Sequence, residues 1–503
     1  MSKLTYQSWK FPALFLIALT ANAEVRLPKI LSSHMVLQRE RPIHLWGWAE
    51  PGENVSATFG GSTQTANADK LGRWSLYFPP QPAGGPFQLT IKGSNTVELD
   101  DVLIGDVWFA SGQSNMEMPL QGFPGNSITK NSEEEIRNAN QPNIRLLHVR
   151  QKASDYPLPN YEQSWTACTP ETARSFSAVA YFFGRDLAGR EHVPIGLIDS
   201  TWGGTPAEAW TSLASLSSDA GLMPVFAARA QMANEQTDFL AAKVMEERED
   251  ARARQANQPP PKHSWHPNFA SWGPAWLYNG MIAPAIGYPI KGVIWYQGES
   301  NSGTTRAPLY SRLFPTLISD WRMHWREGNF PFLFVQLANF KSGPDERWPI
   351  IREAQRRTLS LANTGMAVTI DIGDPDNIHP ADKQDVGARL ALAARALAYG
   401  EHIEYSGPLF RQTSIEKDGV RVWFDHATGL TAKGGAPSGF EIAGEDHHFE
   451  AATATIEGEN ILVTNPQVTA PKYVRYGWAD APTLNVYNSA GLPASPFTSE
   501  PAL

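Results

Sequence analysis

Large apolar residues occupy alternate positions in the first part of the chain that follows residue 23. The pattern runs over 74–78 and repeats over 87–91, and clusters of Pro and Gly separate such runs. Alternation of this kind is typical of strands with one buried face, and the Pro and Gly clusters mark the turns between them. The pattern predicts a β-sandwich region over 24–104.

Beyond residue 104 the periodicity changes. Short apolar runs typical of buried strands alternate with helix-like runs, over 178–188, 309–325 and 349–362. This alternation predicts an α/β domain over 105–405, in which a parallel sheet is sandwiched by helices. A charged, helix-favouring stretch at 226–256, followed by three prolines, interrupts the pattern, and we interpret about 213–275 as a helical insertion.

Strand-like alternation returns near the end of the chain, over 420–424 and 461–463. It predicts a second β-rich region over 406–503. Nothing in the sequence decides whether the two β regions pack together as one accessory unit.

The first 23 residues have the pattern of a secretory signal peptide. Lys3 and Lys10 precede an apolar run at 11–19, and Ala21-Asn22-Ala23 fits a cleavage site with small residues. The run is too short to span a membrane, and we expect no membrane association after cleavage. The prediction is a secreted protein, most simply a periplasmic one.

Composition agrees with an exported globular protein. The chain has 503 residues, 42% of them hydrophobic, and a formal net charge of −9 without a basic run, which argues against nucleic acid as a partner. Cys168 is the single cysteine, so the chain has no internal disulfide, and we expect its thiol to be buried. The sequence does not determine the oligomeric state.

The stretch 105–118 contains the strongest signal for chemistry. An apolar run that predicts a buried strand stops at Gly112, and Ser114 follows where a helix can begin. Backbone N–H groups at a helix start point toward the position of a developing oxyanion. Ser114 is therefore a candidate nucleophile, although Ser is also a common helix N-cap.

A candidate base lies far downstream. Asp376 precedes His379 by three residues in a Pro-bounded loop, so one short segment can present both side chains together. The carboxylate can accept a hydrogen bond from one imidazole nitrogen, while the other nitrogen faces Ser114 as a general base.

Two further strand-like runs end in residues that can donate hydrogen bonds. One is followed by Gly203-Gly204, and the other by Gln297. In a parallel sheet both strand ends lie on the same rim as Ser114. A glycine N–H and an amide side chain would complete an oxyanion hole, although Gly203-Gly204 also suits a tight turn and Gln297 a strand-end cap.

Four segments of the chain together resemble the sialate O-acetylesterase family of SGNH hydrolases. They are Gly-Gln-Ser-Asn-Met-Glu-Met (112–118), Ser-Thr-Trp-Gly-Gly-Thr (200–205), Trp-Tyr-Gln-Gly-Glu-Ser-Asn (295–301) and Asp-Asn-Ile-His-Pro (376–380). The likeness extends to Met-Val-Leu-Gln at 35–38 and Leu-Pro-Ala-Ser-Pro-Phe at 492–497, so it covers nearly the whole mature chain.

This resemblance implies an SGNH-type fold and a role for each matching residue. Ser114 is the implied nucleophile, His379 the base and Asp376 its orienting acid. The implied oxyanion donors are Ser114, Gly204 and Gln297, and the expected substrate contacts are Trp202, Glu299 and Asn301. Many SGNH enzymes carry Gly-x-Asn-Asp in the third segment, so the assignment of Gln297 there is an interpretation.

The implied reaction needs no metal and no organic cofactor. His263 and His266 lie in a Pro/Trp-rich loop and His447-His448 beside acids, so we interpret them as solvated or hydrogen-bonded. Besides Trp202, three tryptophans offer flat faces to a sugar, although each also suits a core position: Trp265, Trp272 and Trp276.

The expected function is removal of O-acetyl groups from a sugar or oligosaccharide, with sialate as the first candidate. Acetylated xylan or xyloglucan is the alternative substrate. A sialate site requires a cation for the carboxylate, and Arg306 is one of several arginines available. A non-catalytic carbohydrate-binding protein is the alternative from another class, but it would not need Ser114, Asp376 and His379 together.

Overall fold

Strand β7 (Thr96–Gly112) connects the N-terminal part of the molecule to its centre. Its first half pairs antiparallel with β6 (Gly84–Lys92), and its second half is buried in the central sheet. The predicted boundary at 104/105 thus lies within one continuous strand. The computed structural model describes residues 24–261, 263 and 266–501, so the predicted signal peptide at 1–23 lies outside the described residues.

The central sheet is parallel, as the sequence predicted. Its strands run in the order β13-β12-β11-β7-β10-β8, every neighbouring pair is parallel, and β9 adds an antiparallel edge. The partners of β7 are β8 (Gln141–His148), β9 (Thr166–Cys168), β10 (Ile195–Thr201), β11 (Gly292–Tyr296), β12 (Phe332–Val335) and β13 (Thr364–Ala367). Strand order reverses at β7, where the carboxyl ends of β7, β10 and β11 lie side by side. A ligand site is expected at this point.

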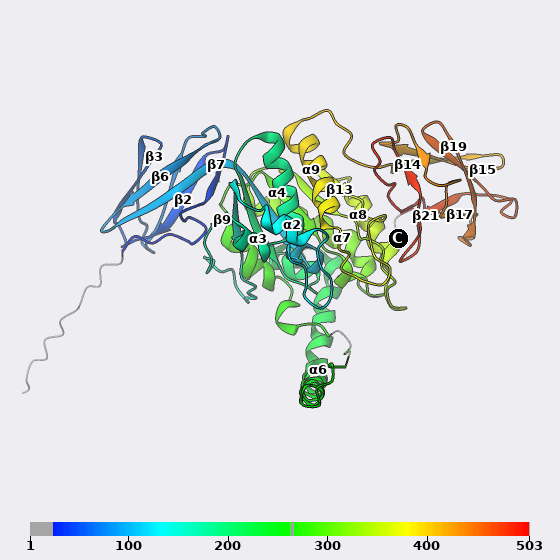
Figure 1. Cartoon of the computed structure of the whole chain (residues 1–503), viewed down its shortest axis with the longest axis horizontal. Helices are drawn as coiled ribbons and strands as arrows, with labels where there is room; N and C mark the ends of the chain where they lie inside the picture. Colours follow the sequence, from blue (N-terminus) through cyan, green and yellow to red (C-terminus); the bar gives the residue numbers. More distant parts are fainter. Residues whose placement is uncertain (1–23, 262, 264–265, 502–503) are drawn as a thin grey trace, which may run out of the picture.

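Helices cover both faces of the sheet. Consecutive residues of β7 point to opposite faces, so neighbouring side chains contact helices on opposite sides. Trp108 contacts Phe183 of α4 (Ala178–Glu191), while Phe109 contacts Trp321 of α7 (Ala307–Trp325). Helix α9 (Lys383–Tyr399) packs beside α4, and α8 (Trp348–Thr358) beside α7. The three-layer α/β arrangement confirms the predicted fold class (Figure 1).

The N-terminal region is built of two sheets that enclose an apolar core. One sheet is the pair β2-β5, and the other contains β3, β4 and β6, which join β7. The strands are β1 (Val36–Gln38), β2 (Ile43–Trp48), β3 (Asn54–Phe59), β4 (Ser62–Asn67) and β5 (Arg73–Phe78). In β5 the burial pattern alternates strictly, with Trp74, Leu76 and Phe78 inside, which confirms the sequence interpretation.

A separate β region with its own hydrophobic core closes the chain. Its two larger sheets have the orders β14-β15-β20-β19 and β18-β17-β21-β23, and β16 pairs with β22. The strands are β14 (Leu409–Glu416), β15 (Gly419–Asp425), β16 (Thr431–Ala432), β17 (Phe440–Ala443), β18 (Glu450–Ala451), β19 (Thr453–Glu457), β20 (Asn460–Thr464), β21 (Tyr473–Tyr476), β22 (Val486–Tyr487) and β23 (Phe497–Thr498). The two β regions lie on opposite sides of the α/β domain, so they are not one unit (Figure 1).

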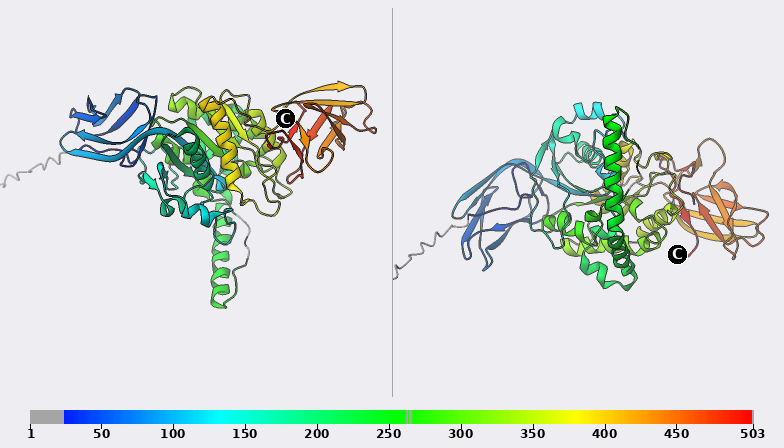
Figure 2. Two further views of the ribbon diagram at one scale, coloured as in Figure 1. Left: turned by 45° about the horizontal axis from the view of Figure 1, so that its top comes forward. Right: turned by 90° about the horizontal axis from the view of Figure 1, so that it is seen from below.

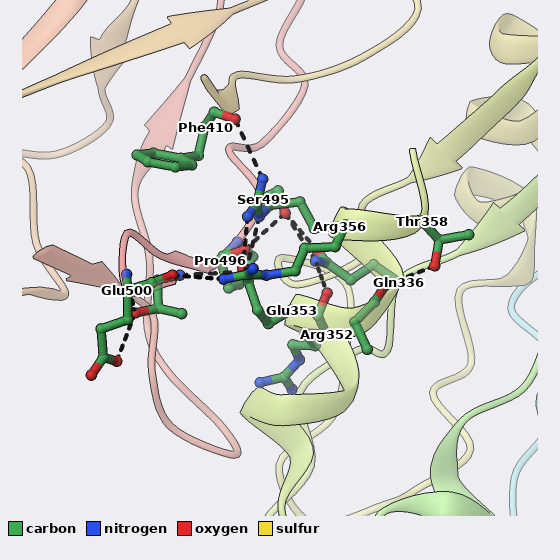
Figure 3. Close-up of polar contacts among 12 residues, drawn as sticks. Gln336, Arg352, Glu353, Arg356, Thr358, Phe410, Ser495, Pro496 and Glu500 are labelled. Carbon is green, nitrogen blue, oxygen red and sulfur yellow. Dashed lines mark hydrogen bonds and ion pairs between the residues drawn. The ribbon is translucent and has the colours of Figure 1, made fainter. Parts of the chain in front are cut away.

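Polar contacts fasten the C-terminal region to the α/β domain around helix α8 (Figure 3). The Gln336 amide donates to the Ser495 hydroxyl at 2.9 Å, and the Arg357 guanidinium donates to the Glu500 carbonyl at 2.7 Å. Arg352, fully buried, donates to the carbonyls of Leu337 and Ala338 on one side and of Ala479 and Asp480 on the other. Such a buried guanidinium is tolerated because four carbonyl oxygens surround it.

Helix α6 (Pro224–Gln255) extends away from the body of the molecule (Figure 2). It forms most of the predicted insertion, together with α5 (Leu213–Ser218), and it contacts η2 and η3. Within the part of the chain that the structure describes, no helix is long and apolar enough to cross a membrane. The remaining helices are short: α1 (Ser114–Glu117), α2 (Ser132–Arg137), α3 (Pro170–Arg174), η1 (Ala207–Trp210), η2 (Ala220–Leu222), η3 (Phe269–Ser271), η4 (Tyr278–Ile282), η5 (Ala283–Ala285) and η6 (Glu299–Asn301).

Candidate active site

Ser114 is the first residue of α1, directly beyond the carboxyl end of β7. Gly112 makes this turn possible: its φ is +136°, and a Cβ there would overlap the carbonyl oxygen of Tyr296 in β11. Ser114 is half-buried, and its backbone N–H has no acceptor among the described residues. The serine is thus presented at the rim of the sheet with an unpaired N–H beside it, as the strand-to-helix pattern predicted.

The loop after β10 lies against this serine. A Cβ on Gly203 would come within 3.2 Å of the Ser114 Cβ, so the close approach requires glycine. Gly204 has a φ of +67°, and its carbonyl accepts a hydrogen bond from the Trp272 indole at 2.5 Å. Its N–H has no acceptor in the described part of the chain. The loop that carries Gly203 and Gly204 thus packs against Ser114, and the N–H groups of Ser114 and Gly204 both lack an acceptor among the described residues.

His379 is tied to the nucleophile turn through its neighbour in the chain. The Asn115 amide donates to the Ile378 carbonyl at 2.9 Å, which joins the residue after Ser114 to the residue before His379. The Ser127 hydroxyl donates to the His379 carbonyl at 2.7 Å, and the Phe123 ring packs edge-on against the imidazole at a centroid distance of 5.2 Å. These contacts join the backbone at 378–379 to the turn that carries Ser114 and fix the imidazole against the Phe123 ring.

Burial, and then the nearby charge of Lys383, lower the pKa of His379 to about 4. The imidazole is consequently neutral at neutral pH and has a lone pair with which to accept a proton. A neutral imidazole is the form that a general base requires.

The Asp376 side chain lies on the protein surface, away from the imidazole of His379. Its side chain is 81% exposed, and a carboxylate oxygen pairs with the Lys341 ammonium at 2.8 Å. The Asp374 carboxylate accepts from the Asp376 N–H at 2.9 Å, so a tight turn directs the Asp376 side chain outward. The Nδ1 atom of His379 is buried and, among the described residues, has no hydrogen-bond partner. The structure does not bring the predicted acid and base together.

Gln297 follows β11 but is fully buried beneath the rim. Its amide nitrogen lies 2.7 Å from the Asn301 Oδ1, 3.2 Å from the Gln113 Oε1 and 3.2 Å from the Thr205 carbonyl, and its Oε1 accepts from the Tyr310 hydroxyl at 3.0 Å. Both amide protons already have acceptors inside the protein. This differs from the expected free donor, because the strand end is surrounded by buried polar groups that need a partner.

The three expected sugar contacts are placed differently from one another. Asn301 is 1% exposed, and its amide donates to the buried Glu208 carboxylate at 2.9 Å. Glu299 is 7% exposed and accepts from the Asn115 amide at 2.6 Å. Trp202 alone is half-buried, with part of its ring surface open. Among the other tryptophans, Trp272 contacts Gly204, and Trp276 contacts α6. Trp265 lies outside the described residues.

Comparison with known proteins places these elements in a family. A model of the carbohydrate esterase, sialic acid-specific acetylesterase domain matches residues 263–396. The chain is 31% identical to the sialate O-acetylesterase of Mus musculus over 537 residues, which covers 96% of each chain. It is 34% identical to the sialate O-acetylesterase of Homo sapiens over 439 residues, which covers 78% of this chain and 74% of that one.

The chain belongs to the sialate O-acetylesterase family. A solved structure agrees: a carbohydrate acetylesterase from Xanthomonas citri superimposes with a TM-score of 0.81 at 39% identity, and the match covers 95% of this chain and all of that one. The resemblance predicted from four short segments is thereby confirmed.

Glu117 belongs to the same esterase site and was not predicted from the sequence. Its carboxylate accepts from the Gly203 N–H and from the Gln151 amide, and so fixes the glycine turn against α1. Burial raises the pKa of Glu117. A carboxylate three residues after Ser114 was the available signal, since it lies one helical turn away.

The other titratable candidates have structural positions in this esterase. Cys168 is buried, as expected, and burial raises the pKa of its thiol to about 12. His263 pairs with Asp250 and His266 with Glu246, both at 2.9 Å, and both acids belong to α6. Across residues 24–261, 263 and 266–501, no group of three or more His, Cys, Asp and Glu side chains is arranged to hold a metal ion.

Proposed function

We propose that the protein is a serine esterase that removes O-acetyl groups from carbohydrates, with O-acetylated sialic acid as the first candidate substrate. The observation that carries the proposal is Ser114 at the start of α1, between the open N–H groups of Ser114 and Gly204. Two backbone donors beside a serine suit the stabilisation of a tetrahedral oxyanion. The names of the family members support acetyl esters as the substrate class.

In the proposed reaction the Ser114 hydroxyl attacks the acetyl carbonyl while His379 takes its proton. The N–H groups of Ser114 and Gly204 stabilise the negative oxygen of the tetrahedral intermediate, each by a few kcal/mol. The intermediate collapses to acetyl-Ser114 and releases the sugar hydroxyl, which receives the proton from His379. Water then attacks the acetyl group by the same steps, giving acetate and free Ser114.

Acetate release across a set of acetyl esters tests this function. The set contains O-acetylated sialic acid, acetylated xylan, acetylated xyloglucan and a small chromogenic acetate ester. We expect turnover of at least one acetylated carbohydrate, with sialate preferred. Binding of these sugars without any acetate release would contradict the esterase and indicate a carbohydrate-binding protein.

A neutral acetylated sugar is the second candidate substrate, and the position of Arg306 favours it. The Arg306 guanidinium pairs with the buried Glu208 carboxylate and stacks on Trp272 at 4.6 Å. Its charge is therefore already balanced, which leaves it poorly suited to hold a sialate carboxylate. Faster turnover of xylan or xyloglucan than of sialate would select this candidate.

Export to the periplasm is part of the proposal. It rests on the pattern of residues 1–23 and on the lone buried Cys168, which needs no disulfide partner. The expected partner there is an O-acetylated sugar or oligosaccharide.

Asp376 remains the proposed orienting acid, although Lys341 binds it in this structure. An exposed side chain can rotate, and catalytic hydrogen bonds often form only with substrate bound. We expect Asp376→Asn to lower kcat by roughly 10²-fold or more, because the imidazole loses the carboxylate that fixes its tautomer. Steady-state kinetics with the preferred acetate ester provide the measurement.

Lys341→Met is the matched control for that prediction. It breaks the same ion pair but leaves the carboxylate free for His379, so we expect kcat to stay within about twofold of wild type. Equal losses in both variants would mean that the ion pair tethers the loop and that Asp376 does not orient the base.

The pH dependence of catalysis follows from the low pKa of His379. The base works only when neutral, and a pKa of about 4 instead of 6.5 keeps it neutral through the mildly acidic range. We expect kcat/KM to fall on the acid side only as the pH approaches 4. An acid limb near pH 6.5, measured where the protein stays folded, would contradict the assigned environment of His379.

A further inference from the structure

Three side chains beneath the catalytic rim form one hydrogen-bonded cluster. The Asn115 amide nitrogen donates to the Glu299 Oε1 at 2.6 Å, and the Asn115 Oδ1 accepts from the Lys383 ammonium at 2.6 Å. The three residues come from α1, η6 and the first turn of α9, so the cluster joins three segments that are far apart in the sequence.

The cluster links a buried acid and a buried base through Asn115. Lys383 is 0% exposed, and Glu299 is almost fully buried, with one carboxylate oxygen that has no hydrogen-bond partner among the described residues. Burial raises the pKa of Glu299 and lowers the pKa of Lys383 to about 7, and the opposite charge of each group offsets part of this shift in the other. Asn115 bridges them, because its amide donates to the acid and accepts from the ammonium.

Asn115 and Lys383 also contact the loop that carries the base. The same Asn115 amide donates to the Ile378 carbonyl at 2.9 Å, next to His379, and Lys383 begins α9 four residues after His379. Asn115 is adjacent to Ser114 in the chain. Asn115 therefore joins the cluster to the turn that carries Ser114, and both Asn115 and Lys383 join it to the segment that carries His379.

We propose that Asn115, Glu299 and Lys383 act as one positioning unit that holds the His379 loop against the Ser114 turn, with the Lys383 ammonium as its charged centre. The unit rests on the proposed function, in which Ser114 and His379 must meet. All three side chains are buried beneath the rim, so we assign them a positioning role and not contact with the substrate. A misplacement of the base by about 1 Å is sufficient to lower a rate by roughly 10²-fold.

The unit has an electrostatic consequence for His379. The charge of Lys383 contributes, after burial, to the lowered pKa of the imidazole. The charged groups that face Lys383 are Glu299 and Asp382, and Asp382 is itself paired with Lys130 at 2.7 Å. The Tyr296 ring covers the ammonium at 5.7 Å. Removal of the Lys383 charge is therefore expected to raise the pKa of His379.

Lys383→Met tests the proposal, because it keeps the length of the side chain and removes its charge. We expect kcat to fall about 10-fold to 100-fold with little change in KM. We also expect the titration of His379 to move upward by about half a pH unit or more. The titration is followed by NMR of histidine-labelled protein, with the His379 signal assigned from His379→Gln.

Lys130→Met is the matched control, since it removes an exposed cation that pairs with Asp382, the residue before α9. We expect it to change neither kcat nor the His379 titration. A Lys383→Met protein that is merely less stable, with wild-type turnover and an unchanged His379 titration, would overturn the proposal.

A second variant keeps the test decisive if Lys383→Met fails to fold. Glu299→Gln/Lys383→Met leaves no uncompensated buried charge, so we expect it to fold. It still lacks the ammonium, and its His379 titration is expected to move upward as well; an unchanged value would also overturn the proposal. The titration does not depend on turnover, so a wild-type protein that released no acetate would contradict the proposed function alone.

Discussion

Ser114→Ala is expected to abolish acetate release, with kcat reduced by about 10⁴-fold or more. The hydroxyl is the only protein group of the proposed mechanism that forms a bond to carbon, and without it no acetyl-enzyme can form. The side chain is half-buried at the start of a short helix, so its loss leaves the packing intact. Acetate release and the melting temperature, measured on the same preparation, provide the test.

Ser111→Ala is the matched control for this variant. Ser111 lies three residues earlier in β7, is fully buried and has no hydrogen-bond partner for its hydroxyl among the described residues. Its replacement is expected to leave turnover unchanged. Activity near the wild-type level in Ser114→Ala would exclude Ser114 as the nucleophile.

The fold could be predicted because its signals are local. Alternation in β5 and the continuous apolar run that ends at Gly112 each reflect which face of a strand is buried. The two β regions and the parallel sheet follow from such patterns. The 17-residue length of β7 could not be predicted in this way. Its first half alternates and its second half is buried on both faces, so the pattern suggests two strands.

Only the parts of the candidate site that depend on backbone geometry could be predicted from the sequence. Ser114 and Gly204 follow strands that are neighbours in a parallel sheet, so the sequence alone places both residues at the same rim. Asp376 is different, because Lys341 and Asp374 compete for it through side-chain contacts that no spacing reveals. Glu299 and Lys383 lie 84 positions apart, and a pair at that separation leaves no local signal.

Gln297 shows how an amide can change its apparent role once its surroundings are known. The sequence places it at a strand end beside the nucleophile, where a free amide would serve an oxyanion. The structure surrounds it with polar atoms from four other segments, those of Gln113, Thr205, Asn301 and Tyr310. Each of these buried atoms requires a partner, and Gln297 provides it.

Gln297→Ala is accordingly expected to lower the free energy of unfolding by about 2–4 kcal/mol. The loss combines a cavity with several buried polar groups that lose their partner, among them the Tyr310 hydroxyl and the Asn301 amide oxygen. We expect kcat per folded molecule to remain within roughly tenfold of wild type, because the N–H groups of Ser114 and Gly204 still stabilise the oxyanion. Denaturant unfolding and active-site titration on one preparation separate the two effects.

Gln336→Ala provides the comparison that decides between the two roles of Gln297. Gln336 is equally buried, but its amide bonds the Arg352 carbonyl and the Ser495 hydroxyl at the junction with the C-terminal region. If Gln297 acts only through stability, the two variants lose similar free energy and both keep their turnover. If the Gln297 amide leaves its internal acceptors to donate to the oxyanion, Gln297→Ala alone loses roughly 10²–10³-fold in kcat at unchanged KM. That result would make Gln297 a third oxyanion donor and would require its buried hydrogen bonds to rearrange in the transition state.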